Sequence, residues 1–171
     1  MKFTILRLLK PSELGMFHEY RRQGKERAKQ RAINFDWDVV DTVFPSAEDQ
    51  DIIAINCRRL EDEHTVVEVA SWLKRQHRNW RFEGDCPTSP FYRFVDPGVL
   101  FAMVVDASTT PANASWVVVP ADHPARSSIL GHGESARLGK SAMIALYGDE
   151  GQHSQAVLSD HFPQLFKEVK A

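Results

Sequence analysis

The two most apolar runs of the chain constrain its fold more than any other feature. Residues 99–107 (VLFAMVVDA) and 116–120 (WVVVP) are dominated by valine, and the loop between them contains Thr109, Pro111 and Asn113. Short apolar runs bounded by turn-forming residues are typical of buried strands. The two runs therefore predict a pair of core strands that form an antiparallel hairpin.

Five further segments also predict strands. They share β-branched or alternating apolar residues, and they are 2–9, 32–44, 51–60, 64–74 and 79–83. In 32–44, Ile33, Phe35 and Trp37 alternate with polar residues, which is the period of a half-buried strand. Segments 51–60 and 64–74 are joined by the acidic turn 61–63 and predict a strand pair.

Helices are expected near the start and in the last third of the chain. After Ser12, a possible N-cap, Leu14, Phe17 and Tyr20 recur at helical spacing until Gly24. The last third predicts helices over 125–130, 138–147 and 154–170, the last interrupted at Pro163 and capped at Ser154 and Asp160. Strands followed by helices indicate one α+β domain, 1–171, of about seven mostly antiparallel strands that could curl into a partly open barrel.

Composition points to an ordinary globular protein. The 171 residues carry a net charge of −2, with 43% hydrophobic and 26% charged residues, and the length suits one core. No apolar run is long enough for a membrane span, so no membrane partner is expected. Cys57 and Cys86 match no metal-binding spacing. These features favour a cytoplasmic protein of prokaryotic style with reduced thiols.

Two basic stretches in the first half of the chain carry the main functional hypothesis. Segment 72–83 (WLKRQHRNWRFE) interleaves aromatic and cationic residues, and segment 21–31 (RRQGKERAKQR) is cationic without aromatics. Lysine and arginine position phosphates, while arginine, glutamine and asparagine contact base edges. The competing interpretation is that the cations only keep these segments soluble, while Trp72, Trp80 and Phe82 point into the core.

The favoured hypothesis is a domain that binds nucleic acid, with DNA the expected partner, in a restriction, defence or regulatory system. The expected phosphate contacts are Arg21, Arg22, Lys25, Lys29, Arg31, Lys74 and Arg75. The expected base contacts are Gln76, Arg78, Asn79, Trp80 and Arg81. No catalytic residue, metal ligand or cofactor is expected under this hypothesis.

Two alternatives remain open. The first is a Mg²⁺-dependent nuclease that gathers carboxylates from strands, with Glu68, Glu83, Asp96 and Asp106 as candidates. The second is a non-enzymatic accessory subunit that binds another protein. The glycine-rich stretch 131–141 (GHGESARLGKS) has the wrong glycine spacing for a phosphate-binding loop, and the scattered histidines suggest no catalytic triad.

Overall fold

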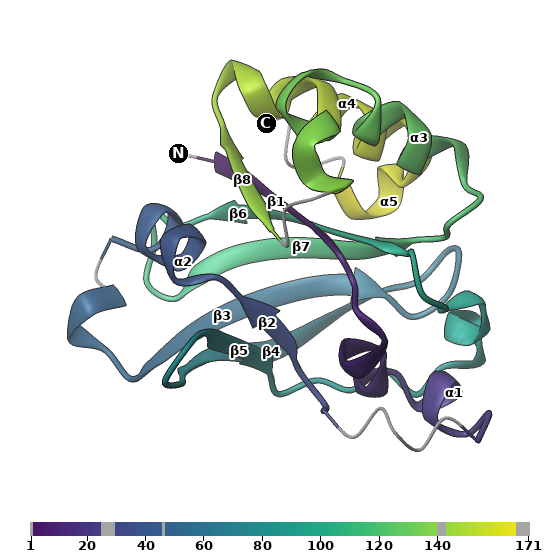
Figure 1. Cartoon of the computed structure of the whole chain (residues 1–171), viewed down its shortest axis with the longest axis horizontal. Coiled ribbons are helices and arrows are strands. Elements are labelled where there is room, and N and C mark those ends of the chain that lie inside the picture. Colours follow the sequence, from purple (N-terminus) through teal and green to yellow (C-terminus); the bar gives the residue numbers. More distant parts are fainter. Residues whose placement is uncertain (1, 25–29, 46, 140–142, 167–171) are drawn as a thin grey trace.

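The computed structural model describes residues 2–24, 30–45, 47–139 and 143–166. Its main element is an eight-stranded sheet that curls into a half-barrel (Figure 1). The strand order is β2-β5-β4-β3-β7-β6-β1-β8, antiparallel except where β3 meets β7. The strands are β1 Lys2–Leu8, β2 Ile33–Phe35, β3 Ile52–Leu60, β4 Val66–Arg75, β5 Trp80–Glu83, β6 Leu100–Asp106, β7 Ala112–Val119 and β8 Ile144–Tyr147.

The predicted central hairpin is confirmed as β6 and β7. Met103 of β6 lies opposite Trp116 of β7, and both side chains are fully buried. β1 pairs antiparallel with β6, and β3 pairs parallel with β7. The apolar hairpin therefore occupies the middle of the sheet, with a neighbouring strand on each side.

The predicted pair of strands around the acidic turn is also confirmed, as β3 and β4. The carboxylate of Asp62 accepts hydrogen bonds from the backbone N–H groups of His64 and Thr65, which fixes the turn. Along β3, buried and exposed side chains alternate, with Ile53 buried and both Ile52 and Asn56 exposed. One face of this strand pair therefore packs on the core, and the other faces solvent.

Two predictions of element type are wrong. Segment 32–44 is a short strand, β2, followed by helix α2, Trp37–Val43, for which Asp36 occupies the N-cap position. Val39, Val40 and Val43 face the core at helical spacing, so the alternating pattern ends at Phe35. The predicted helix 138–147 contains strand β8, which pairs with β1. Pairing with a sheet edge overrides local helix preference there.

The remaining helices follow the predicted pattern in part. The early helix is split by extended Phe17 into the 3₁₀ helix η1, Pro11–Met16, and α1, His18–Arg21. The predicted interruption at Pro163 separates α4, Asp149–His161, from α5, Pro163–Phe166. The predicted caps Ser12, Ser154 and Asp160 all lie inside helices instead. The other helices are η2 Ala47–Asp49, η3 Pro90–Phe94, α3 Pro124–Leu130 and η4 Gly133–Gly139.

Hydrophobic cores lie on both faces of the sheet. The larger core fills the inside of the half-barrel with aromatic rings, including Phe35, Phe82, Phe101 and Trp116. The smaller core lies between the sheet and the layer of α3, α4 and α5 (Figure 1). Helix α2 follows the edge strand β2 and contacts the opposite edge strand β8, so it bridges the opening of the half-barrel. Within the described residues, no helix could cross a lipid bilayer.

Candidate nucleic-acid interface

The β4–β5 hairpin presents the second basic stretch. Lys74 and Arg81 are directly opposite each other on the two strands, and Arg78 lies in the connecting turn. Lys74 and Arg78 are exposed, whereas Arg81 is half-buried and lies 3.8 Å from the carboxylate of Glu83. The turn is closed by a hydrogen bond from the backbone N–H of Gln76 to the carbonyl of Asn79. The hairpin therefore projects two exposed cations beside a partly neutralised one.

Two residues expected to contact nucleic acid serve the core instead. The guanidinium of Arg75 lies between the rings of Trp37 and Trp80, 4.8 and 4.6 Å from their centroids. It also donates hydrogen bonds to the carbonyls of Gln50 and Ala47. Trp80 is completely buried, so its ring is closed to a base in this structure. Arg75 and Trp80 therefore hold α2 and η2 against the sheet.

The first basic stretch lies around α1 and the start of β2. Arg31 is exposed, Arg22 forms an ion pair with the buried Glu19, and Arg21 is half-buried. Burial raises the pKa of the Cys86 thiol, and the nearby positive charges of Arg21 and Arg31 oppose this rise. Both arginines therefore lie close to the segment that follows β5. Lys25 and Lys29 lie outside the described residues.

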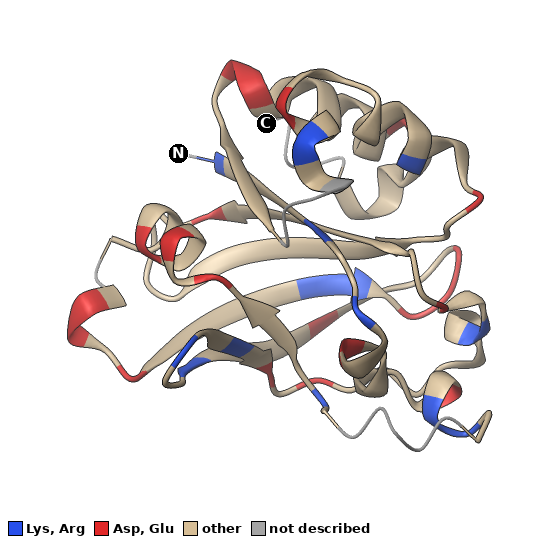
Figure 2. Ribbon diagram, in the orientation of Figure 1, with Lys and Arg blue, Asp and Glu red and all other residues tan. Residues whose placement is uncertain are grey.

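The fold places the two basic stretches at opposite ends of β5. Ile33, two residues after Arg31, lies opposite Phe82 near the end of β5, whereas the turn that carries Arg78 precedes its first residue, Trp80. Three steps of about 3.4 Å along this strand separate its ends by about 10 Å. Figure 2 shows the cations of both stretches along the lower side of the molecule, while α2 and η2 carry acidic residues.

The open outer face of the sheet contains polar residues that the sequence reasoning missed. A groove of about 760 Å³ crosses β4, β3, β7 and β6. Asn56 lies directly opposite Asn113, and Arg58 lies opposite Ser115 on one side and Glu68 on the other. Two-residue alternation along each strand places these side chains on one face. Only the strand pairing brings them together, and no spacing in the sequence predicts the β3–β7 pairing.

The carboxylates proposed for a nuclease are dispersed. Glu68 and Asp106 both line the groove, but they lie on β4 and β6, with β3 and β7 between them. Three steps of about 4.8 Å between strands put their backbones about 14 Å apart, too far to share one ion. Within the described residues, no three histidine, cysteine or acidic side chains are grouped as metal ligands. Asp106 instead accepts hydrogen bonds from the backbone and hydroxyl of Ser108, and these lower its pKa.

The glycine-rich stretch and the histidines belong to the helical layer. Residues 131–132 connect α3 to η4, which spans Gly133–Gly139, and Lys140 and Ser141 lie outside the described residues. His123 contacts His161 with 5.2 Å between the ring centroids, and His132 stacks on His153 at 3.8 Å. Neither pair includes a nucleophile of the kind a triad requires.

Comparisons with known proteins do not extend this description. No protein-family model matches the sequence, and a search of curated proteins finds no significant match.

Proposed function

We propose that this protein binds nucleic acid, with DNA as the expected partner, through a basic surface along β5. We define the basic surface by its described cations, which are Arg22, Arg31, Lys74, Arg78 and Arg81. The observation that carries the proposal is the presence of exposed cations at both ends of one short strand. The phosphates of one DNA strand follow each other every 3.4 Å of helix axis, so a span of about 10 Å corresponds to about three phosphates.

The charge pattern also supports this side of the molecule as the binding surface. Acidic residues gather on α2, η2 and the start of α4 (Figure 2). On the basic surface, Glu19 and Glu83 pair with Arg22 and Arg81, whereas Arg31, Lys74 and Arg78 are exposed. A localised positive surface steers a polyanion even when the whole protein carries a net charge of −2. Binding through a few phosphate contacts should be weak to moderate, with a Kd of roughly 10⁻⁶ to 10⁻⁴ M at physiological salt.

A fluorescence-anisotropy titration tests the proposal. The protein would be titrated into labelled single-stranded DNA, duplex DNA and RNA at about 50 mM and about 200 mM salt. We expect binding that weakens at the higher salt concentration, because counterions released from the phosphates oppose it. Including Mg²⁺ and running the products on a gel tests the nuclease alternative in the same experiment. Absence of binding to all three ligands would overturn the proposal.

A further inference from the structure

The indole of Trp72 lies on the outer face of the sheet, unlike the buried indole of Trp80. Trp72 is half-buried, and its Nε1 donates a hydrogen bond of 3.1 Å to the carboxylate of Glu83. Its six-membered ring lies against Gly84, where an added Cβ would come within 2.6 Å of a ring carbon. The ring is therefore held in place by its neighbours while part of it remains accessible.

Small and cationic residues surround this ring on the same face. Ala54 lies directly opposite Trp72 on β3, and Ala70 lies two residues away along β4. Both alanines are exposed, so their short side chains leave room beside the indole. Lys74 lies two residues away in the other direction, with Arg81 opposite it. An accessible aromatic ring beside two cations is the combination that binds a base and its phosphate.

The groove on the outer face begins at Ala70, next to this ring. Asn56 and Asn113 bring both donors and acceptors into it, and Arg58 brings donors. Glu68 and Asp106 bring acceptors, and each faces a basic residue across the sheet, Arg58 and Lys2 respectively. A mixed lining of this kind suits the edges of nucleobases better than phosphates, because carboxylates repel phosphates but accept hydrogen bonds from base amino groups.

We infer that the ligand is a single-stranded nucleic acid, with one base stacked on Trp72 and a neighbouring base in the groove lined by Asn56 and Asn113. This inference rests on the proposed function and deepens it, since the cations of the basic surface hold the phosphates. In a duplex the bases are stacked on one another, and their faces are closed to a side chain. Exposed sheet faces that carry an aromatic ring bind unstacked bases instead.

Two substitutions at Trp72 test the inference. Trp72→Leu removes the aromatic ring, and Trp72→Phe keeps a smaller one, so the pair separates stacking from simple packing. Both variants would be titrated with oligo-dT, oligo-U and a DNA duplex of the same length, after thermal melting has shown that they fold. We expect Trp72→Leu to bind the single strand about 5- to 100-fold more weakly, with Trp72→Phe retaining most of the affinity. Tryptophan fluorescence of the unaltered protein should be quenched by the single strand, and Trp72→Leu should lose that quenching.

The outcomes distinguish this inference from the function on which it rests. If the unaltered protein binds nucleic acid in a salt-dependent way but Trp72→Leu binds the single strand equally well, the inference is overturned and the proposed function stands. Tighter binding of the duplex than of either single strand would also overturn the inference. If the unaltered protein binds none of the three ligands, the proposed function itself fails.

Discussion

Arg7 and Glu13 form an ion pair that is almost completely removed from solvent. Their side chains are 2% and 0% exposed, and Nε of Arg7 donates to the Glu13 carboxylate at 2.8 Å. The same carboxylate accepts hydrogen bonds from the backbone N–H groups of Lys10 and Asn34. Glu13 thereby joins β1, η1 and β2, which come from different parts of the chain. The three donors satisfy the buried negative charge of Glu13. If that charge were lost, the ion pair would no longer offset the cost of burying the Arg7 guanidinium.

Replacing Glu13 by glutamine should therefore destabilise the fold strongly. Glu13→Gln keeps the shape of the side chain but removes the negative charge that pairs with the buried Arg7, so we expect the free energy of unfolding to fall by about 3–5 kcal/mol. Urea denaturation followed by circular dichroism measures this change. Glu48→Gln, an exposed acid in η2, is the matched control and should change stability by less than about 0.5 kcal/mol. Equal effects of the two substitutions would contradict the assigned role of Glu13.

Strand register and the position of α2 decide which residues of the basic stretch 72–83 face solvent. In the basic stretch 72–83, Lys74 and Arg78 are at the surface, which both interpretations of the sequence require. Strand register then decides that Trp72 faces outward and Trp80 inward, and a shift of one residue would exchange them. The packing of Arg75 between two tryptophans depends on the position of α2, which the sequence pattern did not reveal.

Two pairs of histidines join α3 and α4. His123, at the N-cap of α3, contacts His161 in the last turn of α4, while His132, just after α3, stacks on His153 of α4. The Nδ1 atom of His123 accepts a hydrogen bond from the backbone N–H of Ala125, which a protonated nitrogen cannot do. Partial burial and the charge of His161 lower the pKa of His123, against the opposing effect of Asp122. The contact between the helices is therefore sensitive to protonation of His123.

Acidification should weaken the helical layer. Because the pKa of His123 is lower in the folded protein than in the unfolded chain, its contribution to stability is complete above about pH 6.5 and is lost as the pH falls below that value. We expect the urea midpoint to decrease between about pH 7.5 and about pH 5.5. His161→Gln removes the neighbouring charge and should make this decrease smaller. A midpoint that responds to pH identically with and without His161 would contradict the assignment.

Strands and helices with strong sequence patterns were predicted correctly, and those with weak patterns were not. The hairpin β6–β7 and the pair β3–β4 could be predicted, because apolar composition or alternation agrees with their place in the sheet. The prediction of one strand over segment 32–44 was wrong because three alternating residues fit both a strand and the start of an amphipathic helix. β8 could not be predicted, since its conformation depends on pairing with β1 at the far end of the chain.

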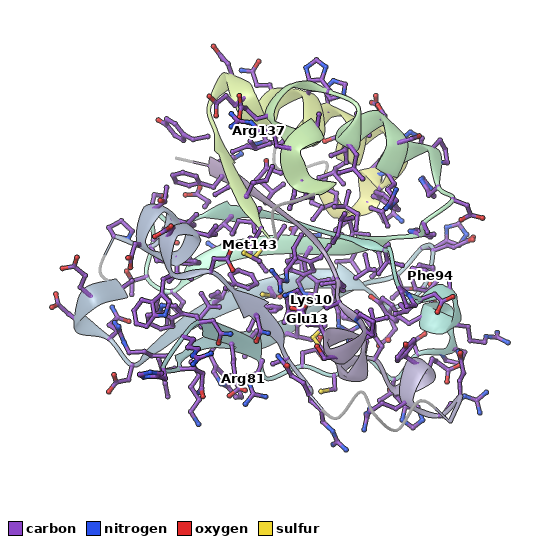
Figure 3. The ribbon with its side chains drawn as sticks, viewed as in Figure 1. Lys10, Glu13, Arg81, Phe94, Arg137 and Met143 are labelled. Atoms are coloured by element: carbon purple, nitrogen blue, oxygen red, sulfur yellow. The ribbon has the colours of Figure 1, made fainter. Side chains whose placement is uncertain are left out.

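Across the whole molecule, exposed cations occur on two opposite sides. The cations of the basic surface lie along β5, whereas Arg137 of η4 lies in the helical layer at the opposite side of the molecule, as Figure 3 shows for Arg81 and Arg137. Arg137 is also paired with Glu134 in the same 3₁₀ helix. Arg137 is therefore an exposed cation that lies outside the proposed interface.

This separation makes the salt dependence of binding a test of which cations contact phosphates. For a single strand, the slope of log affinity against log salt is about −0.7 for each phosphate contact. Substituting Lys74 and Arg78 together by alanine should make this slope less steep by about 1.4, because two contacts are lost. Arg137→Ala should leave the slope unchanged, although it removes an exposed positive charge. A steep slope that persists in the double variant would place the phosphates elsewhere than at the β4–β5 turn. Equal losses in all variants would indicate diffuse attraction to cations over the whole surface and would contradict the assigned contacts.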